Sequence, residues 1–535
     1  MGMNNIPEFI DTEDGGKFWT YRFDNFIVKT YVPKEETISD IVNFGFITPY
    51  LLIFMEKDME MQDCIKFAKE KGFARFAAGY YGSVNFVYPT SENGWIDASP
   101  SIYNDIIANT KNQQYYTHGV IRSRDRFTKE WGDCYIRGAI FRAHLYGYGQ
   151  SADYIGKYCM KTIEGEYLWG PGEITPASVT LHDLSFVPQM ERDDIPVVSA
   201  DNMDEINDAF RGFCKHLIIK NRPDSFVEDF TYAKDYLRWC GTLSESIIPE
   251  RLHMIQETGY ETVHTSRDNA GDYAGTDEHD IGYVVWYNES LKDKDKIPTL
   301  VAFHGGGDSA MYIAHQSGWI NVAHRYKFML IAIENHTDHS ATEIIELLEK
   351  LKNKYPIDPD RFYASGFSMG GCKCWDMYQE YPEYFTALAP MDATFDVGEN
   401  SFGKPVEGQI NRDIAVPVFY AAGEATPLPE LPFQEAKCTN RIKYLFEVNK
   451  VKAPYNYTFE DQSNWDDKLW GIKGETVMRF KDDSRDAVLT ENSFESTDGR
   501  KKTVLASISG QGHECREHTC EYAWKFMFMY KKTKK

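Results

Sequence analysis

Short apolar runs alternate with amphipathic segments through residues 297–421. Five of these runs are rich in β-branched and aromatic residues and have the length of buried strands: 299–303, 328–333, 361–365, 386–390 and 416–421. Between the second and third runs, residues 341–355 carry leucine and isoleucine at helical spacing. Strands that alternate with helices predict an α/β fold with a doubly wound, mostly parallel sheet covered on both faces. Reactive groups in such a sheet lie at the carboxyl ends of its strands.

The first half of the chain repeats this alternation of apolar and amphipathic segments. Four of its segments correspond to segments of the second half: 49–55 to 298–304, 73–78 to 328–333, 141–149 to 362–368, and 195–200 to 416–421. We therefore expect two tandem copies of one α/β plan.

The join between the copies is expected near residues 245–250, after a helical stretch around 235–243. This gives an N-terminal domain of residues 1–245 and a C-terminal domain of residues 246–535. Residues 259–287 then supply two leading antiparallel strands of the second domain, separated by a polar stretch over 266–280.

The composition narrows the function classes. Hydrophobic residues make up 42% and aromatic residues 15% of the 535 positions, as is typical of globular domains. The net charge of −23 disfavours nucleic acid and anionic membranes as partners. No signal-peptide pattern follows Met1, and no stretch approaches the roughly 20 apolar residues of a spanning helix. The 10 cysteines are too sparse for a disulfide scaffold. These features favour a cytoplasmic protein with free thiols.

The segment 366–370 reads Gly-Phe-Ser-Met-Gly and fits the Gly-x-Ser-x-Gly elbow, in which a serine occupies a strained turn between a strand and a helix. Small neighbours are needed because the turn lifts the serine oxygen clear of the sheet. The pentapeptide alone is a weak signal. Its position between a predicted strand and a predicted helix indicates that Ser368 is a nucleophile.

A glycine-rich loop, His304 to Gly307, ends the first strand of the same sheet. Glycines let the backbone approach a substrate closely, and their N–H groups are suited to stabilising a developing oxyanion. We expect the oxyanion donors to be the backbone N–H groups of Gly305, Gly306 and Met369.

The general base is expected late in the chain, since this fold orders its triad as serine, acid and histidine. His513 lies in a loop between the strand 503–508 and the helix 520–530, and we favour it over His518, which lies in or near that helix. Cys515 and Cys520, together with both histidines, are also conceivable zinc ligands, but their spacing matches no common structural site. We predict no metal and no cofactor.

The acid of the triad is the least defined residue. It is expected just after the strand 416–421, where Glu424 is the first carboxylate. Glu430 is the second candidate, and Asp392, after the preceding strand, is the third. We expect Glu424 to orient the imidazole.

An aromatic-rich insertion lies between the acid and the base, at about residues 436–500. It contains Tyr455, Tyr457, Trp465 and Trp470. The insertion is compatible with a lid or substrate platform, and equally with aromatic side chains buried against the sheet.

These motifs resemble a known group. The His-Gly-Gly-Gly loop, the Asp-Pro-Asp-Arg-Phe-Tyr strand leading into Gly-Phe-Ser-Met-Gly-Gly, and the late Gly-His are similar to the polyhydroxybutyrate-depolymerase-like, feruloyl and acetyl-xylan esterases of the α/β-hydrolase superfamily. The resemblance covers about residues 255–535. It implies cleavage of carboxylic esters without a cofactor, with Ser368 as nucleophile and His513 as base. The family usually carries an aspartate in the acid loop, where this chain has Glu424 and Thr426.

The first half looks like a decayed copy of the same domain. Residues 55–58 read Met-Glu-Lys-Asp where oxyanion glycines are expected, and Gly149 falls at the nucleophile position. A register two residues later would make Ser151 the nucleophile, but Asp153 would then replace the second small residue of the elbow. We expect this half to be non-catalytic.

Three functions fit the sequence. The first is hydrolysis of a carboxylic ester through an acyl-enzyme with a Ser-His-acid triad. The second is hydrolysis of an amide or peptide by the same triad. The third is binding or scaffolding on a hydrolase fold, since a fold alone does not fix a function. The intact serine, histidine and glycine loop favour a hydrolase over a binding protein for the second half, and the triad does not distinguish an ester from an amide. Ester hydrolysis is our leading hypothesis. The acyl and alcohol parts of the substrate and the oligomeric state are left open.

Overall fold

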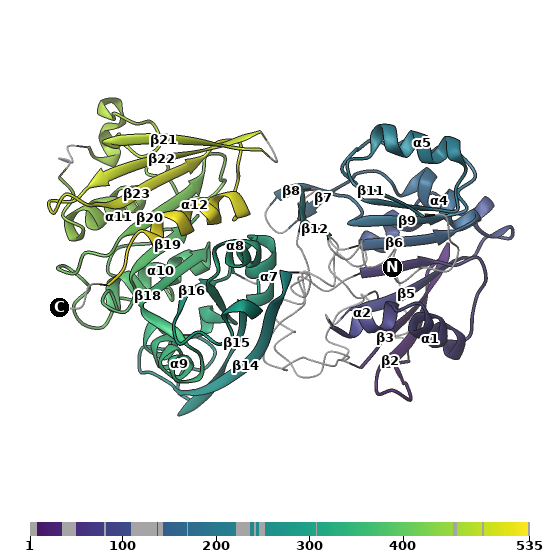
Figure 1. The fold of residues 1–535 in the computed structure, drawn as a ribbon, viewed down its shortest axis with the longest axis horizontal. Coiled ribbons are helices and arrows are strands. Elements are labelled where there is room, and N and C mark those ends of the chain that lie inside the picture. The colour runs from purple at the N-terminus through teal and green to yellow at the C-terminus, as the bar shows by residue number, and fades with distance from the viewer. Residues whose placement is uncertain are drawn as a thin grey trace. The chain divides into compact units, whose positions relative to one another are not determined.

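The computed structural model describes residues 8–34, 50–79, 82–108, 136, 143–167, 170–220, 236–239, 242–245, 252–306, 308–452, 457–483 and 486–532. The chain divides into two compact units, Met1–Ile248 and Pro249–Lys535. Each unit contains one large sheet, so the two are described separately (Figure 1).

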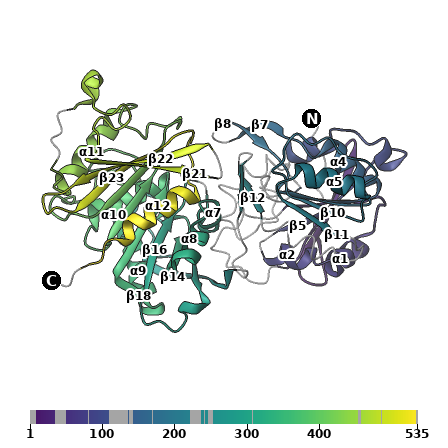
Figure 2. The same ribbon diagram turned by 45° about the horizontal axis from the view of Figure 1, so that its top comes forward.

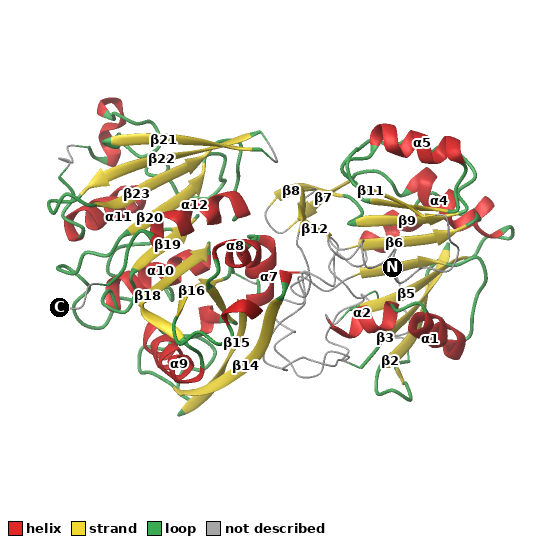
Figure 3. Cartoon of the chain, in the orientation of Figure 1, coloured by secondary structure: helices red, strands yellow, loops and turns green. Residues whose placement is uncertain are grey.

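The C-terminal unit alternates strands and helices, as Figure 3 shows by colour. Its strands are β14 (Met254–His264), β15 (Glu278–Asn288), β16 (Ile297–Phe303), β17 (Met329–Ile333), β18 (Ile357–Phe367), β19 (Ala387–Met391), β20 (Val418–Gly423), β21 (Thr476–Asp482), β22 (Ala487–Glu495) and β23 (Lys501–Ile508). Its helices are η6 (Glu289–Leu291), α7 (Ala310–Gln316), α8 (Trp319–Tyr326), η7 (His336–Asp338), α9 (Ala341–Lys354), α10 (Met369–Glu380), α11 (Ala436–Val448), η8 (Phe459–Asn464) and α12 (Glu517–Phe528).

The ten strands form one sheet in the order β14-β15-β17-β16-β18-β19-β20-β23-β22-β21. The strands from β17 to β23 pair in parallel, whereas β14 and β15 at one edge and β22 and β21 at the other pair antiparallel. This arrangement confirms the predicted α/β fold with a mostly parallel sheet, and it is the strand arrangement of an α/β hydrolase. The chain order reverses between β16 and β18, so the loops after these two strands meet at a switch point.

Helices cover both faces of this sheet. On one face, Trp524 of α12 stacks on Phe328 at 3.7 Å between ring centroids and meets Tyr363 of β18 edge to face. Figure 2 shows α12 crossing this face. On the other face, α9, α10 and α11 pack with the alternate residues Phe362 and Ala364 of β18 in one large buried cluster. A central strand covered on both faces explains why residues 362–366 of β18 are all buried and do not alternate with exposed positions.

The N-terminal unit is built in the same way. Its strands are β1 (Ile10–Asp11), β2 (Lys17–Arg22), β3 (Phe26–Val32), β4 (Tyr50–Phe54), β5 (Ser83–Pro89), β6 (Ala143–Tyr148), β7 (Ile163–Tyr167), β8 (Gly170–Ile174), β9 (Ser178–His182), β10 (Val197–Ala200), β11 (Leu217–Lys220), β12 (Tyr236–Trp239) and β13 (Thr242–Glu245). Its helices are α1 (Met61–Glu70), α2 (Phe73–Gly79), η2 (Gly94–Ile96), α4 (Gln150–Tyr158) and α5 (Asp204–Phe213).

The large N-terminal sheet has the order β1-β2-β3-β5-β4-β6-β9-β10-β11. From β3 onward this order matches β15-β17-β16-β18-β19-β20-β23 of the C-terminal unit strand for strand. In both sheets the first and second of these strands pair antiparallel, and the pairing is parallel from the second and third strands onward. Two sheets with one topology fit the predicted tandem copies. The strands β4, β6 and β10 therefore correspond to β16, β18 and β20.

Two predicted elements of the first half are wrong. Residues 73–78 form helix α2, and the counterpart of β17 is β5, which pairs with β3 and β4. Phe73 and Ala77 are buried one helical turn apart, and the three alanines of this segment favour a helix. The expected helix around 235–243 is also replaced, because β12 and β13 form an antiparallel pair there. Aromatic and β-branched residues favour strands at these positions.

The insertion at residues 436–500 contributes to the core. It contains α11 and η8, and its strands β21 and β22 extend the sheet beyond β23. Tyr457 and Trp470 are buried in the main cluster, and Trp470 lies 5.3 Å from Tyr420 between ring centroids. Trp465 is half-buried against the same cluster, and Tyr455 lies outside the described residues. Burial against the sheet therefore accounts for Tyr457 and Trp470. Among the helices that the structure describes, none is long and apolar enough to cross a membrane.

Candidate active site

The segment expected to form a nucleophile elbow lies at the end of β18. Ser368 has φ 54° and ψ −119°, a conformation that a residue with a side chain seldom adopts, and α10 begins directly after it. A Cβ on Gly366 would overlap the carbonyl oxygen of Gly370, and a Cβ on Gly370 would overlap that of Phe303. The glycines are thus required for the close approach of strand and helix, and the turn holds the Ser368 hydroxyl at the carboxyl end of the sheet.

His513 lies against this serine. Its Nε2 is 2.9 Å from Ser368 Oγ, which is hydrogen-bonding distance, and its ring packs on Phe367 with 4.8 Å between centroids. The residue comes from the loop between β23 and α12, as the sequence predicts. Burial lowers the pKa of His513 below its usual value, against the opposing effect of Asp392. The imidazole is therefore neutral near pH 7 and has a free electron pair for the serine proton.

The carboxylate that pairs with His513 is that of Glu430, the second candidate from the sequence. Glu430 Oε1 forms an ion pair with His513 Nδ1, and both side chains are buried. The first candidate, Glu424, instead accepts a hydrogen bond from Ser507 Oγ at 2.9 Å. The expectation for Glu424 is corrected for a physical reason. After β20 the loop makes a longer excursion through Pro427 and Pro429, and it is this excursion that carries a carboxylate to the imidazole.

The position of Glu430 is fixed by the core. The hydroxyl of Tyr420, on β20, donates to Glu430 O at 2.8 Å, and Gln434 Oε1 accepts from Glu430 N at 2.9 Å. Burial raises the pKa of Glu430, while hydrogen bonds from Thr426 and Asp392 oppose that rise.

The third candidate, Asp392, lies behind Glu430. Its Oδ1 accepts from Gly423 N at 2.8 Å. Burial, followed by the charge of Glu430, raises the pKa of Asp392 well above its usual value. The raised pKa of Asp392 and the pKa of Glu430, raised to about 8, together favour a proton held between these two carboxyl groups.

The glycine loop after β16 lies beside the elbow. A Cβ on Gly306 would lie 3.0 Å from Met369 Cγ, and one on Gly305 would lie 3.2 Å from Phe367. His304 Nδ1 is 2.7 Å from Gly305 O. Because a trans peptide directs its C=O and N–H to opposite sides, this bond turns the N–H of Gly306 away from His304. Gly307 lies outside the described residues.

His518, the alternative base, and Cys515 and Cys520, the alternative zinc ligands, lie in other surroundings. His518 lies within α12, and its ring is 5.0 Å from that of Tyr522. Cys515 Sγ and Cys520 Sγ are buried and lie 3.5 Å apart. His513 contacts Ser368 and Glu430, whereas Cys515 and Cys520 contact each other.

The N-terminal unit has an elbow of the same shape. Gly149, after β6, has φ 56° and ψ −121°, and α4 begins directly after it. The backbone N–H of Gln150, which corresponds to Met369, donates to Glu56 Oε1 at 2.9 Å. Ser151 is buried in α4, where its hydroxyl donates to Tyr148 O and accepts from Tyr148 N. The register with Gly149 at the elbow is therefore the one that the backbone adopts.

Comparisons with known proteins point to esterases. A bifunctional acetylxylan esterase/xylanase of Neocallimastix patriciarum is 24% identical over 195 residues, which are 34% of this chain and 28% of that protein. The chain thus matches less than a third of this relative's length. No family model matches the chain.

Two solved structures are similar to part of the chain. The acetyl xylan esterase from Aspergillus awamori is 12% identical, and the alignment covers 50% of this chain and 99% of that one with a TM-score of 0.32. An S-formylglutathione hydrolase from Staphylococcus aureus is 18% identical, with 36% and 88% covered and a TM-score of 0.25.

Proposed function

We propose that the C-terminal unit is a serine hydrolase that cleaves carboxylic esters through an acyl-enzyme, with Ser368, His513 and Glu430 as its triad. The observation that carries this proposal is the chain of contacts from Ser368 Oγ to His513 Nε2 and from His513 Nδ1 to Glu430. A strained elbow serine, a neutral imidazole and a buried carboxylate in this order are the components of nucleophilic catalysis.

In the first half of the reaction, His513 Nε2 takes the proton from Ser368 as Oγ attacks the ester carbonyl carbon. The negative charge that develops on the carbonyl oxygen is stabilised by the N–H of Met369 and by the glycine loop at Gly305 and Gly306. The imidazolium donates through Nδ1 to Glu430. It then passes its Nε2 proton to the leaving alcohol oxygen, and the C–O bond breaks to leave an acyl-Ser368 ester.

In the second half, water replaces the alcohol. His513 removes a proton from the water as its oxygen attacks the acyl carbon, and it returns that proton to Ser368 Oγ as the acid product leaves. No cofactor takes part in these steps. The similarity to an acetylxylan esterase supports an ester substrate and makes acetyl the first acyl group to test.

The N-terminal unit is proposed to be non-catalytic. Gly149 has no side chain to act as a nucleophile, and the backbone donor after it is already bound by the Glu56 carboxylate. A carboxylate at this point repels the charge that an oxyanion hole must stabilise. These two features support a hydrolase fold without hydrolase chemistry.

A matched pair of substrates tests the reaction class. We expect the whole protein to release p-nitrophenol from p-nitrophenyl acetate and to turn over the corresponding p-nitroanilide far more slowly. Anilide turnover at a similar kcat/KM would identify an amide hydrolase, and turnover of neither compound across a series of acyl lengths would contradict the proposal.

A further inference from the structure

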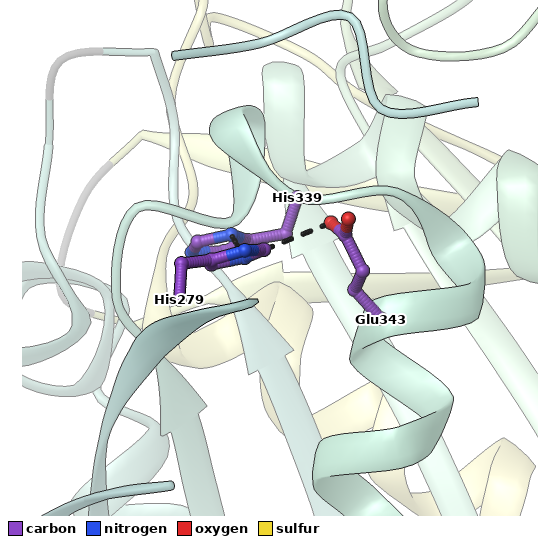
Figure 4. Close-up of side chains that lie close together, drawn as sticks. All are labelled: His279, His339 and Glu343. Atoms are coloured by element: carbon purple, nitrogen blue, oxygen red, sulfur yellow. Dashed lines mark hydrogen bonds and ion pairs between the residues drawn. The ribbon is translucent and has the colours of Figure 1, made fainter. Parts of the chain in front are cut away.

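A second group of chemically active side chains lies outside the triad, in the C-terminal unit. His279 at the start of β15, His339 after η7 and Glu343 in α9 bring one donor atom each to within 4.8 Å of one another (Figure 4). His279 Nε2 is 3.0 Å from His339 Nδ1 and 3.8 Å from Glu343 Oε2. All three residues are buried.

These separations suit a bound divalent cation. Imidazole nitrogens and carboxylate oxygens bind Zn²⁺ at about 2.0–2.2 Å, and tetrahedral geometry then places neighbouring donor atoms about 3.3 Å apart. The separations of His279 from His339 and from Glu343 lie on either side of this value. Two imidazoles and one carboxylate also form a donor set that suits zinc and neighbouring transition metals and leaves coordination positions for water.

The supporting contacts hold the donors in the form that binds metal. Thr265 Oγ1 lies 2.8 Å from His279 Nδ1, so a proton on Nδ1 leaves the electron pair of Nε2 directed at the cluster. Glu343 is held by Asn269, whose side-chain amide donates to both carboxylate oxygens at 3.0 and 2.8 Å, and by the backbone N–H of Ser266 at 2.7 Å. Residues that ligate metals are typically oriented by such outer contacts.

The cluster is also enclosed. The Tyr273 ring stacks on His279 at 4.1 Å and on His339 at 5.5 Å between centroids, with interplanar angles of 7° and 15°. An aromatic cover over nearly coplanar imidazoles fixes their planes and keeps bulk water off one side. Tyr273 belongs to the polar connection between β14 and β15, so the cluster joins this connection to the start of α9.

We propose that His279, His339 and Glu343 bind a structural divalent transition-metal ion of the zinc type. The ion bridges the β14–β15 connection and the segment before α9. His339 also links this segment to the elbow. Its carbonyl oxygen accepts a hydrogen bond from Lys373 Nζ at 2.7 Å, and Lys373 lies on α10, the helix that begins directly after Ser368. The site therefore stabilises the frame around the elbow and takes no part in the reaction.

Metal binding is tested on the full chain after chelator treatment. Addition of Co²⁺ is expected to give one equivalent bound with the visible absorption of a nitrogen- and oxygen-ligated ion, and Zn²⁺ is expected to displace it and raise the unfolding temperature. His279→Gln and His339→Gln should each weaken Co²⁺ binding by more than about 10-fold, since loss of supporting residues alone costs that much. Thr265→Val, which retains all three ligands, should weaken binding by roughly 10–100-fold.

His264→Gln is the matched control. His264 ends β14 and pairs with Glu346 of α9, but it is exposed, so this variant removes a neighbouring histidine–glutamate pair without touching the cluster. Binding should match that of the unsubstituted protein. The proposal is overturned by absence of stoichiometric binding to the unsubstituted protein, by binding that is unchanged in folded His279→Gln or Thr265→Val, or by a sulfur-to-cobalt charge-transfer band, which would assign the metal to cysteines.

Discussion

Gly149 and Ser368 hold the same backbone conformation, with φ and ψ of 56° and −121° at Gly149 and of 54° and −119° at Ser368. Each follows the corresponding central strand of its sheet and precedes a helix. The elbow is thus retained in a unit that has glycine at the position of the serine. Only glycine adopts this conformation without strain. The turn therefore costs little free energy at Gly149. At Ser368 the fold holds a residue with a side chain in the strained conformation, and its hydroxyl contacts His513.

Restoring a serine to the N-terminal elbow should not restore reactivity. A Cβ on Gly149 would lie 2.6 Å from Glu56 Oε1, and Glu56 already occupies the Gln150 N–H. We expect Gly149→Ser, made in a Ser368→Ala background, to give no adduct with a fluorophosphonate probe. Ser151→Ala should leave labelling of the otherwise unchanged protein intact. A probe adduct that depends on Ser151 would show a second active site and refute the non-catalytic assignment.

Replacing Glu430 and replacing Glu424 should have very different effects on kcat. Glu430→Gln removes the charge next to His513 Nδ1 and should lower kcat by on the order of 10³–10⁴-fold, as loss of the triad acid does elsewhere. Glu424→Gln is the matched control, since its amide oxygen still accepts from Ser507. It should keep activity within a few-fold of the unsubstituted protein. Steady-state kinetics on one p-nitrophenyl ester decides between them, and the reverse ranking would return the role to Glu424.

Asp392 should be replaceable by its neutral isostere. The raised pKa of Asp392 favours its protonated form, which donates to Glu430 while its other oxygen accepts from Gly423 N, and an asparagine supplies both. We expect Asp392→Asn to retain most of the activity. Asp392→Ala should lose on the order of 10-fold, the equivalent of one buried hydrogen bond. A large loss in a folded Asp392→Asn would mean that this residue carries a needed charge.

The acid limb of the pH profile should report His513. Only the neutral imidazole accepts the serine proton, so kcat/KM falls as the pH drops through the pKa of His513. Burial lowers that pKa, and the limb should therefore lie below the usual value of 6.5. His518→Ala should leave the limb in place. A limb centred above pH 7 would show that the folded protein stabilises the imidazolium in the resting state, contrary to the geometry described.

The sequence predicts the site to the extent that local pattern determines it. Ser368 and the glycine loop follow from short motifs at strand ends, and His513 follows from its place between β23 and α12. Glu430 does not, because the path of a loop with two prolines depends on Tyr420 and Gln434, which fix it by tertiary contacts. The apolar run over 73–78 predicts a strand where the structure has helix α2, because a short apolar run fits either element.

The proposed metal-binding cluster has no signature in the sequence. His279, His339 and Glu343 come from three separate elements and form no spacing motif, so only the packing of the β14–β15 connection onto α9 brings them together.

The central claim is that Ser368 is the nucleophile, and intact-mass analysis after fluorophosphonate treatment tests it most directly. The unsubstituted protein should gain the mass of one probe adduct, and folded Ser368→Ala should gain none while its ester turnover falls by on the order of 10⁴-fold or more. A probe adduct on Ser368→Ala, or retention of a tenth of the activity by that variant with an unchanged unfolding temperature, would contradict the account.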